Sequence, residues 1–294
     1  ALDIGVIPRC HLEDITRADF YGFVIPFVQE LMKLSEESRI PVKVRACDTM
    51  GYGVTYPGVA LPRSVKGIIY GLVTYANVPS ERLEWHGHND FYLAMNNATT
   101  AWLYGCCGAN GTLLGLGERT GNTPLEGLII EYIELRGEQN GIDTTVITDI
   151  AEYYEKEIGY HIPPNKPFTG KDFNITRAGI HADGLTKDEE IYNIFDTVKL
   201  LKRQPGVTIT DKSGAAGIAH WLNAYLKLEG SKRLDKTLPS MDRKVYPLDK
   251  SHPAVLKIKD WIDAEYASER TTAISDEEML AQANLHLPEY FIHD

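Results

Sequence analysis

The chain has 294 residues, of which 43% are hydrophobic and 24% charged, and it carries a formal net charge of −11. This composition is typical of a globular protein with one large domain or two smaller ones. The acidic charge and the lack of a basic stripe argue against nucleic acid or an anionic membrane surface as a partner. No apolar run reaches about 18 residues, so we expect no transmembrane helix. Only four cysteines occur, which favours reduced thiols and a cytoplasmic location.

Apolar strands and helical segments alternate over the first 158 residues. Strands are predicted over residues 2–10, 42–47, 108–115 and 143–148, and a further strand ends within residues 83–90. Apolar residues at helical spacing predict helices over residues 17–37, 62–76, 91–104, 125–136 and 150–158. Pro26 should kink or break the first of these helices. Strand–helix units of about 35–40 residues are the signature of a parallel α/β sheet or barrel.

A proline-rich linker over residues 161–167 marks a change of character, and the chain beyond it is mostly helical. Four helices are predicted there, beginning at Thr186-x-x-Glu189, at Ala215, after Pro253 and at Ser275-x-x-Glu278. The first and the last begin at capping boxes, in which a hydroxyl and a carboxylate satisfy backbone amides reciprocally. We therefore expect two parts, residues 1–162 and residues 163–294.

Two histidines stand at the end of the strand that precedes residue 90. Side chains on a strand alternate between its faces, so His86 and His88 should point to the same side. Two imidazoles placed in this way can chelate one metal ion, and Asn89 and Asp90 can orient the same site. A solvated strand end with two polar rings is the alternative, since short motifs match often by chance.

The loop over residues 115–122 is rich in glycine and follows the next strand. Its spacing, GxGxxxG, is one residue longer than the dinucleotide fingerprint, which argues against a nicotinamide or flavin site. A flexible turn is the plain alternative. In a parallel barrel, however, all strands open their carboxyl ends on one face, where active sites form. We expect seven polar residues at or just beyond such ends, namely Arg9, Glu13, Thr49, His86, His88, Glu118 and Asn122.

Five motifs in order resemble the metal-dependent acyl-CoA condensing enzymes on a TIM barrel, the isopropylmalate, homocitrate, citramalate and Re-type citrate synthases. The motifs are Arg9-x-x-x-Glu13-Asp14, Asp48-Thr49-x-Gly51, His86-Gly87-His88-Asn89-Asp90, the loop 115–122, and Ala178-Gly179-Ile180-His181-Ala182-Asp183-Gly184. The resemblance covers roughly residues 4 to 230. Within the family, residues 9–19, 47–57 and 99–105 look most like Re-citrate synthase.

The resemblance also implies roles for individual residues. It gives His86, His88 and Asn122 as metal ligands, Arg9 and Thr49 as binders of the 2-oxo acid carboxylate, and Glu13, His181 and Glu118 as catalytic residues. Glu13 and His181 would be the acid/base pair near the acetyl-CoA methyl group, with His181 often supplied by the other subunit. Glu118 and its loop would shape the acyl-CoA pocket. The tyrosine that accompanies the family's C-terminal histidine has no obvious counterpart.

The implied reaction condenses acetyl-CoA with a 2-oxo acid, most closely oxaloacetate to citrate plus CoA. A divalent ion, Mn²⁺, Mg²⁺, Co²⁺ or Zn²⁺, would polarise the ketone as a Lewis acid. A base removes a proton from the thioester methyl, and the carbanion equivalent attacks. The full-length enzyme is expected to be a homodimer. Homocitrate or 2-isopropylmalate synthesis is the alternative within the family, and a panel of 2-oxo acids would separate them.

The first strand of this chain corresponds to the family's fourth. We therefore expect a partial (β/α)8 barrel, about strands 4–8, followed by a helical C-terminal subdomain, and little activity from this chain alone. An unpaired edge and an open apolar interior should result. Two readings of other classes remain. A hydroxy-acyl-CoA lyase is one, although Asn89-Asp90 replaces the Asp-Thr pair that lyases resemble. An inactive metal-binding fragment is the other.

Overall fold

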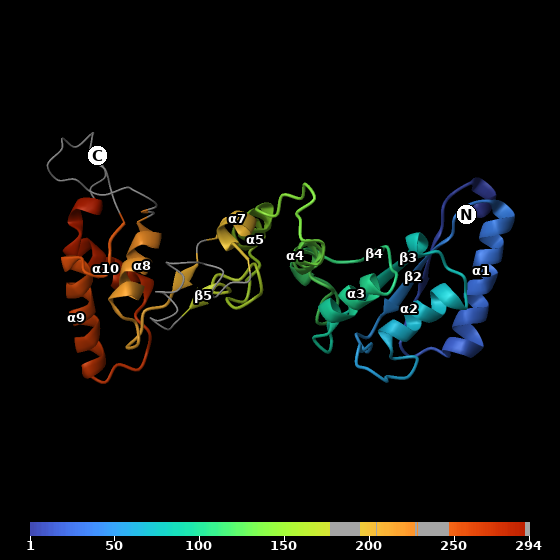
Figure 1. Ribbon diagram of the computed structural model, residues 1–294, viewed down its shortest axis with the longest axis horizontal. Helices are drawn as coiled ribbons and strands as arrows, with labels where there is room; N and C mark the ends of the chain where they lie inside the picture. The colour runs from blue at the N-terminus through green and yellow to red at the C-terminus, as the bar shows by residue number, and fades with distance from the viewer. Residues whose placement is uncertain (177–194, 204, 227, 229–246, 292–294) are drawn as a thin grey trace. The chain divides into compact units, whose positions relative to one another are not determined.

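A computed structural model of the chain describes residues 1–176, 195–203, 205–226, 228 and 247–291 (Figure 1). It divides into two compact units, Ala1–Ile142 and Asp143–Asp294. The expected division into residues 1–162 and 163–294 stays a prediction. No helix among the described residues is both long and apolar enough to cross a membrane. The four cysteines are free thiols.

The first unit is built on a parallel sheet in the order β1-β2-β3-β4. Its strands are β1 (Arg9–Leu12), β2 (Lys43–Asp48), β3 (Leu83–Gly87) and β4 (Gly108–Ala109). Its helices are α1 (Ile25–Ser38), α2 (Val65–Thr74), α3 (Ala94–Leu103) and α4 (Leu125–Arg136). Short turns of 3-10 helix cover Leu2–Ile4, Ser80–Arg82 and Leu113–Gly115, and a π turn covers Phe20–Val24. The expected parallel α/β fold of a partial barrel is confirmed.

The two faces of the sheet differ in chemistry. On one face Val44, Ala46, Leu83 and Trp85 are buried against α1, α2 and α3. Burial of a large apolar side chain contributes about 1.5–3 kcal/mol, so this face holds the unit together. The opposite face carries charged and polar side chains, Arg9, His11, Arg45, Glu84 and His86. The expected apolar interior is therefore wrong for the described sheet, because the strands alternate apolar and polar residues.

Several expected boundaries were also wrong. The strand expected over residues 2–10 begins only at Arg9, and the apolar side chains of Ile4, Val6 and Ile7 before it are exposed. The helix expected from residue 17 begins as the π turn at Phe20 and continues directly as α1 from Ile25, with Pro26 in the first turn of α1. The expected kink or break at Pro26 stays a prediction. The strand expected over residues 108–115 ends at Ala109.

The strand expected over residues 143–148 is absent from this described stretch. The amide and hydroxyl of Thr145 both donate to Asp143 Oδ1, at 3.0 and 2.6 Å. This local turn takes the backbone away from strand pairing, and α5 (Val146–Lys156) follows at once. The sheet of the first unit therefore has four strands among the described residues.

The second unit is mostly helical, as expected. After α5 it contains α7 (Thr197–Leu201), α8 (Ala215–Tyr225), α9 (Pro253–Ala267), α10 (Asp276–His286) and a 3-10 turn, Pro288–Tyr290. A two-stranded parallel sheet, β5 (Ile175–Thr176) and β6 (Gly206–Val207), was not expected. Apolar residues of α8, α9 and α10 form its core. The helices expected at Ala215, Pro253 and Ser275 are confirmed, whereas Thr186-x-x-Glu189 lies outside the described residues.

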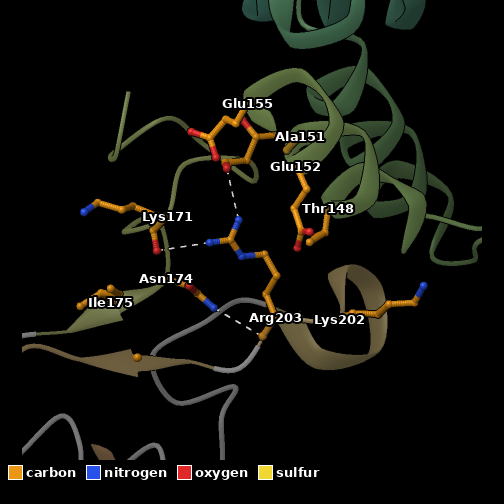
Figure 2. A pocket seen from close by; sticks show the side chains of 11 residues that line it. Thr148, Ala151, Glu152, Glu155, Lys171, Asn174, Ile175, Lys202 and Arg203 are labelled. Atoms are coloured by element: carbon orange, nitrogen blue, oxygen red, sulfur yellow. Dashed lines mark hydrogen bonds between the residues drawn. The ribbon is translucent and has the colours of Figure 1, made fainter. Parts of the chain in front are cut away.

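A cavity of about 390 Å³ lies in the second unit, beside α5, α7 and β5 (Figure 2). Arg203 lines it, and its guanidinium donates to the carbonyl oxygens of Thr169, Gly170 and Lys171 at 3.2, 3.0 and 3.2 Å. Burial lowers the pKa of Arg203. The guanidinium is thus committed to holding the backbone turn after the proline-rich linker, and it has a structural role here.

Candidate functional site

Both histidines of the motif stand at the carboxyl end of β3. The ring centroids of His86 and His88 are 5.3 Å apart, and the ring planes are nearly perpendicular, at 89°. His86 belongs to the polar face of β3 and is half-buried, whereas His88 is buried just beyond the strand. Burial and the neighbouring His88 lower the pKa of His86. Neutral imidazole is the form that binds metal ions, so this shift favours ligation.

Asn122 reaches the same place from the glycine-rich loop. Its backbone forms an antiparallel bridge with His88. Its side-chain Nδ2 lies 3.4 Å from His88 Nε2 and donates to the Gly87 carbonyl at 3.4 Å. A Cβ atom at Gly117 would overlap Asn122 Oδ1, so glycine is required for the loop to close over the amide. The three side chains predicted as metal ligands therefore lie together, while their role stays a prediction.

One buried nitrogen atom of this cluster has no hydrogen-bond partner among the described residues. This atom is His88 Nδ1, which is shielded from solvent. A buried polar atom without a partner costs about 1–3 kcal/mol, so such atoms need a reason. Two imidazoles and an amide suit Mn²⁺, Co²⁺ or Zn²⁺. The residues present therefore fit a divalent ion.

Glu13 and Thr49 are brought into contact by the ends of β1 and β2. The Thr49 hydroxyl donates to Glu13 Oε2 at 2.7 Å, and it accepts from the Asp14 amide at 2.7 Å. Because the hydroxyl has one proton, the amide contact directs that proton toward the carboxylate. The two residues predicted for catalysis and for substrate binding thus form one hydrogen-bonded pair.

Arg9 is the first residue of β1, and the expectation that it stands at a strand's carboxyl end is wrong. The paired register with β2 runs from Arg9 to Leu12, and just before it the Pro8 carbonyl accepts from the Lys43 amide at 2.9 Å. Its guanidinium contacts Glu84 Oε1 at 3.0 Å, and Arg45 contacts Glu84 Oε2 at 2.6 Å. Burial alone would raise the pKa of Glu84, but the hydrogen bonds and charges of Arg45 and Arg9 outweigh it and lower that pKa.

Sequence reasoning missed Glu84 and Arg45. The signal was present in the strand alternation, because Glu84 stands two residues before His86 and so shares its face. Arg45 lies directly across from Glu84 in the register of β2 with β3. A buried carboxylate flanked by two guanidinium groups therefore lies on the same face of the sheet as His86.

The loop over residues 115–122 is anchored by Arg119, which the sequence analysis did not select. Its guanidinium donates to both carboxylate oxygens of Asp90, at 3.0 and 3.3 Å, and to the Thr49 carbonyl. Glu118 is mostly exposed, and its nearest ion-pair partner is Arg119 at 3.9 Å. The structure therefore does not bring Glu118 against the histidines, and His181 lies outside the described residues.

A further group of metal-ligating side chains joins Glu13 to two residues, His11 and Cys47, to which the sequence analysis gave no role. His11, Glu13 and Cys47 each offer one ligand atom, and these atoms all lie within 4.8 Å of one another. Cys47 is fully buried, and burial together with Glu13 raises the pKa of its thiol to about 12.

Comparison with known proteins shows which families and enzymes the chain is similar to. Residues 11–153 match the HMGL-like family. The chain is 60% identical over 293 residues to a citrate (Re)-synthase of Syntrophus aciditrophicus, covering 100% of this chain and 44% of that protein. It is 53% identical over 289 residues to a citrate (Re)-synthase of Clostridium kluyveri, covering 98% of this chain and 61% of that protein.

A more distant relative, homocitrate synthase 1 of Nostoc, is 32% identical over 197 residues and shares 66% of this chain and 48% of its own length. The chain thus spans about half the length of the curated relatives it matches. These matches cover the strands that carry the histidine pair and the Glu13–Thr49 pair. The chain therefore contains an HMGL-like domain over residues 11–153 and is related to citrate (Re)-, isopropylmalate and homocitrate synthases.

Proposed function

We propose that this chain is part of an acyltransferase that condenses acetyl-CoA with a 2-oxo acid, with oxaloacetate as the favoured acceptor and citrate plus CoA as products. The identities of 60% and 53% to citrate (Re)-synthases support this choice. The observation that carries it is the meeting of His86, His88 and Asn122 beside the Glu13–Thr49 end of the same sheet. A homodimer and a cytoplasmic location, which suits four free thiols, belong to the proposal.

His86, His88 and Asn122 would hold the divalent ion on which enzymes of this family depend. When bound, the ion supplies Lewis-acid polarisation of the acceptor's ketone. The chain's own contribution is to keep His86 neutral through burial and to fix the Asn122 amide against His88. Mn²⁺, Mg²⁺, Co²⁺ and Zn²⁺ all remain within the proposal.

Glu13 is proposed as the base that removes a proton from the acetyl-CoA methyl group. The electron pair left on that carbon forms the new bond to the ketone carbon, and water then cleaves the thioester and releases CoA. Thr49 donates to Glu13 Oε2 and so fixes the direction in which the other carboxylate oxygen faces. His181 is proposed as the partner acid, and Arg9 and Thr49 as contacts of the acceptor's carboxylate. When the acceptor is bound, the Thr49 hydroxyl would turn its one proton from Glu13 to that carboxylate. Glu118 is proposed to line the acyl-CoA pocket.

The test is release of CoA, followed with a thiol reagent, by the gene product that carries these 294 residues. Glu13→Gln should lower kcat by about 10²–10⁴-fold, the usual contribution of a general base. Glu37→Gln is the matched control, because Glu37 is exposed on α1 and should leave the rate unchanged. Equal rates in the two variants would contradict the assignment of Glu13.

The acceptor is tested with a panel of oxaloacetate, 2-oxoglutarate and 2-oxoisovalerate, and the proposal expects CoA release fastest with oxaloacetate. A faster reaction with either other acid favours homocitrate or 2-isopropylmalate synthesis, for which related synthases are known. Cleavage of a hydroxy-acyl-CoA without condensation favours a lyase. The 294 residues alone are expected to release little CoA, since related synthases are longer.

A further inference from the structure

The His11, Glu13 and Cys47 group lies on the polar face of the sheet, outside the histidine pair. His11 belongs to β1 and Cys47 to β2, and Glu13 stands just beyond β1. His11 Nδ1 lies 3.9 Å from Glu13 Oε1. The thiol is fully buried while the other two residues are exposed, so an ion from solvent meets the imidazole and the carboxylate before the thiol. The proposed function uses only the carboxylate, which leaves the other two groups without a role.

The donor set of nitrogen, oxygen and sulfur selects the kind of ion. Thiolate ligands favour Zn²⁺ over Mg²⁺ or Mn²⁺. Zn²⁺ bonds of 2.0–2.3 Å in a tetrahedron place ligand atoms about 3.3–3.8 Å apart, so the group needs to contract by about 1 Å. Three protein ligands and one open position are a common arrangement for zinc.

Two features of the surroundings oppose cation binding, namely the raised pKa of the Cys47 thiol and the positive charge of Arg45, and each is at least partly offset. Burial raises the pKa of the Cys47 thiol, but a coordinating ion removes the thiol proton outright. The Arg45 guanidinium lies 3.5 Å from His11 Nε2. Its positive charge is partly compensated by the Glu84 carboxylate at 2.6 Å, which also pairs with Arg9 at 3.0 Å. The repulsion on an ion at His11 is therefore reduced.

We propose that His11, Glu13 and Cys47 form a second cation site, preferring a thiol-binding ion such as Zn²⁺, and that its occupancy withdraws Glu13 from catalysis. A coordinated carboxylate is a weaker base, so Glu13 bound to the ion would no longer take up a proton. It is also a weaker acceptor, so its hydrogen bond from the Thr49 hydroxyl would weaken. The withdrawal step rests on the proposed function, whereas the binding step does not.

The binding step is tested by titrating the 294-residue chain with Co²⁺, whose bond to a thiolate gives a near-ultraviolet charge-transfer band. The proposal expects the band to appear with one equivalent and to be lost in Cys47→Ser. His86→Ala should keep the band, and so should Cys107→Ser, the matched control at an exposed cysteine. Absence of the band in the unaltered chain, or its loss in Cys107→Ser alone, would overturn the site.

The withdrawal step is tested in the CoA-release assay with Mn²⁺ present and Zn²⁺ added. Half-inhibition should need at least about ten-fold more Zn²⁺ in Cys47→Ser than in the unaltered enzyme, the effect expected when a ligand is lost. Equal inhibition of both enzymes would overturn the withdrawal. A Cys47-dependent cobalt band in a protein that releases no CoA with any 2-oxo acid would instead overturn the proposed function and leave the cation site standing.

Discussion

Glu84 joins the two guanidinium groups on the polar face of the sheet. Its side chain is 11% exposed, and the side chain of Arg45 is 15% exposed, so this pair is largely removed from water. Arg9 is more open, at 42%. A buried carboxylate needs partners to stay charged, and here two cations supply them. Glu84 therefore fixes the side chain proposed to meet the acceptor's carboxylate.

Glu84→Gln removes this charge while keeping the shape of the side chain. We expect the free energy of unfolding to fall by about 1.5–3 kcal/mol, because hydrogen bonds to charged groups are lost and Arg45 stays buried. Urea unfolding followed by circular dichroism measures the change. Glu37→Gln on the surface is the control and should lie within about 0.5 kcal/mol of the unaltered chain. A change for Glu84→Gln no larger than for the control would contradict the role of the pair.

His86 should make the metal-free fold less stable in mild acid. Its pKa in the fold is below the ordinary 6.5, so the unfolded chain takes up a proton at a pH where the folded chain does not. Stability therefore falls as pH drops from about 6.5 toward the lowered pKa. His86→Gln removes this dependence. Urea unfolding measures the free energy of unfolding at pH 7.5 and 5.5, and this energy should fall less in the variant than in the unaltered chain at the lower pH. The same difference between the two chains at both pH values would refute the role of His86.

The helix signals of the second unit were strong enough to predict elements from sequence. Ser275 accepts from the Glu278 amide at 3.2 Å, and the Glu278 side chain accepts from the Ser275 amide at 2.8 Å, which is the predicted capping box. Arg270 also bonds Glu278 and, with Ser275, lowers the pKa of that carboxyl to about 2.

Ser275→Ala should lower the free energy of unfolding of the second unit by about 1 kcal/mol, since the first turn of α10 loses a cap. Ser275→Asp keeps an acceptor at the same place and should lose much less. Thermal unfolding of both variants measures the difference. Equal loss in the two variants would show that the cap does not stabilise α10.

Strand boundaries were predicted less well than helix starts, and the reason is physical. β2 and β3 alternate buried apolar and polar residues, and this period identified both. Ile4, Val6 and Ile7 have the apolar pattern of a strand but are exposed. A strand forms only beside a partner strand, and the sequence does not give the position of that partner. A turn held by the hydrogen bond from Thr145 to Asp143 stands where a strand was predicted. The spacing of apolar residues along the sequence cannot reveal such a side-chain hydrogen bond.

At the scale of the whole molecule, the order of motifs predicted the family, and the parallel register explains why. Strands that run side by side bring their carboxyl ends together, so residues as distant in sequence as Glu13, Thr49 and His86 could be assigned to one edge. Glu84 and Arg119 escaped notice because their importance lies in ion pairs across strands and loops. Such pairs depend on register and loop closure, which a single sequence leaves open.

The proposed function depends above all on the binding of a divalent ion by His86 and His88 with Asn122. The most direct measurement is the Mn²⁺ affinity of the 294-residue chain, read from the paramagnetic resonance signal of free Mn²⁺. His86→Ala should weaken binding by more than the about 10–100-fold that loss of an outer partner costs. Cys47→Ser, in the thiol-containing group, should bind Mn²⁺ as the unaltered chain does. Unchanged Mn²⁺ affinity in both His86→Ala and His88→Ala would show that the two histidines do not bind the ion.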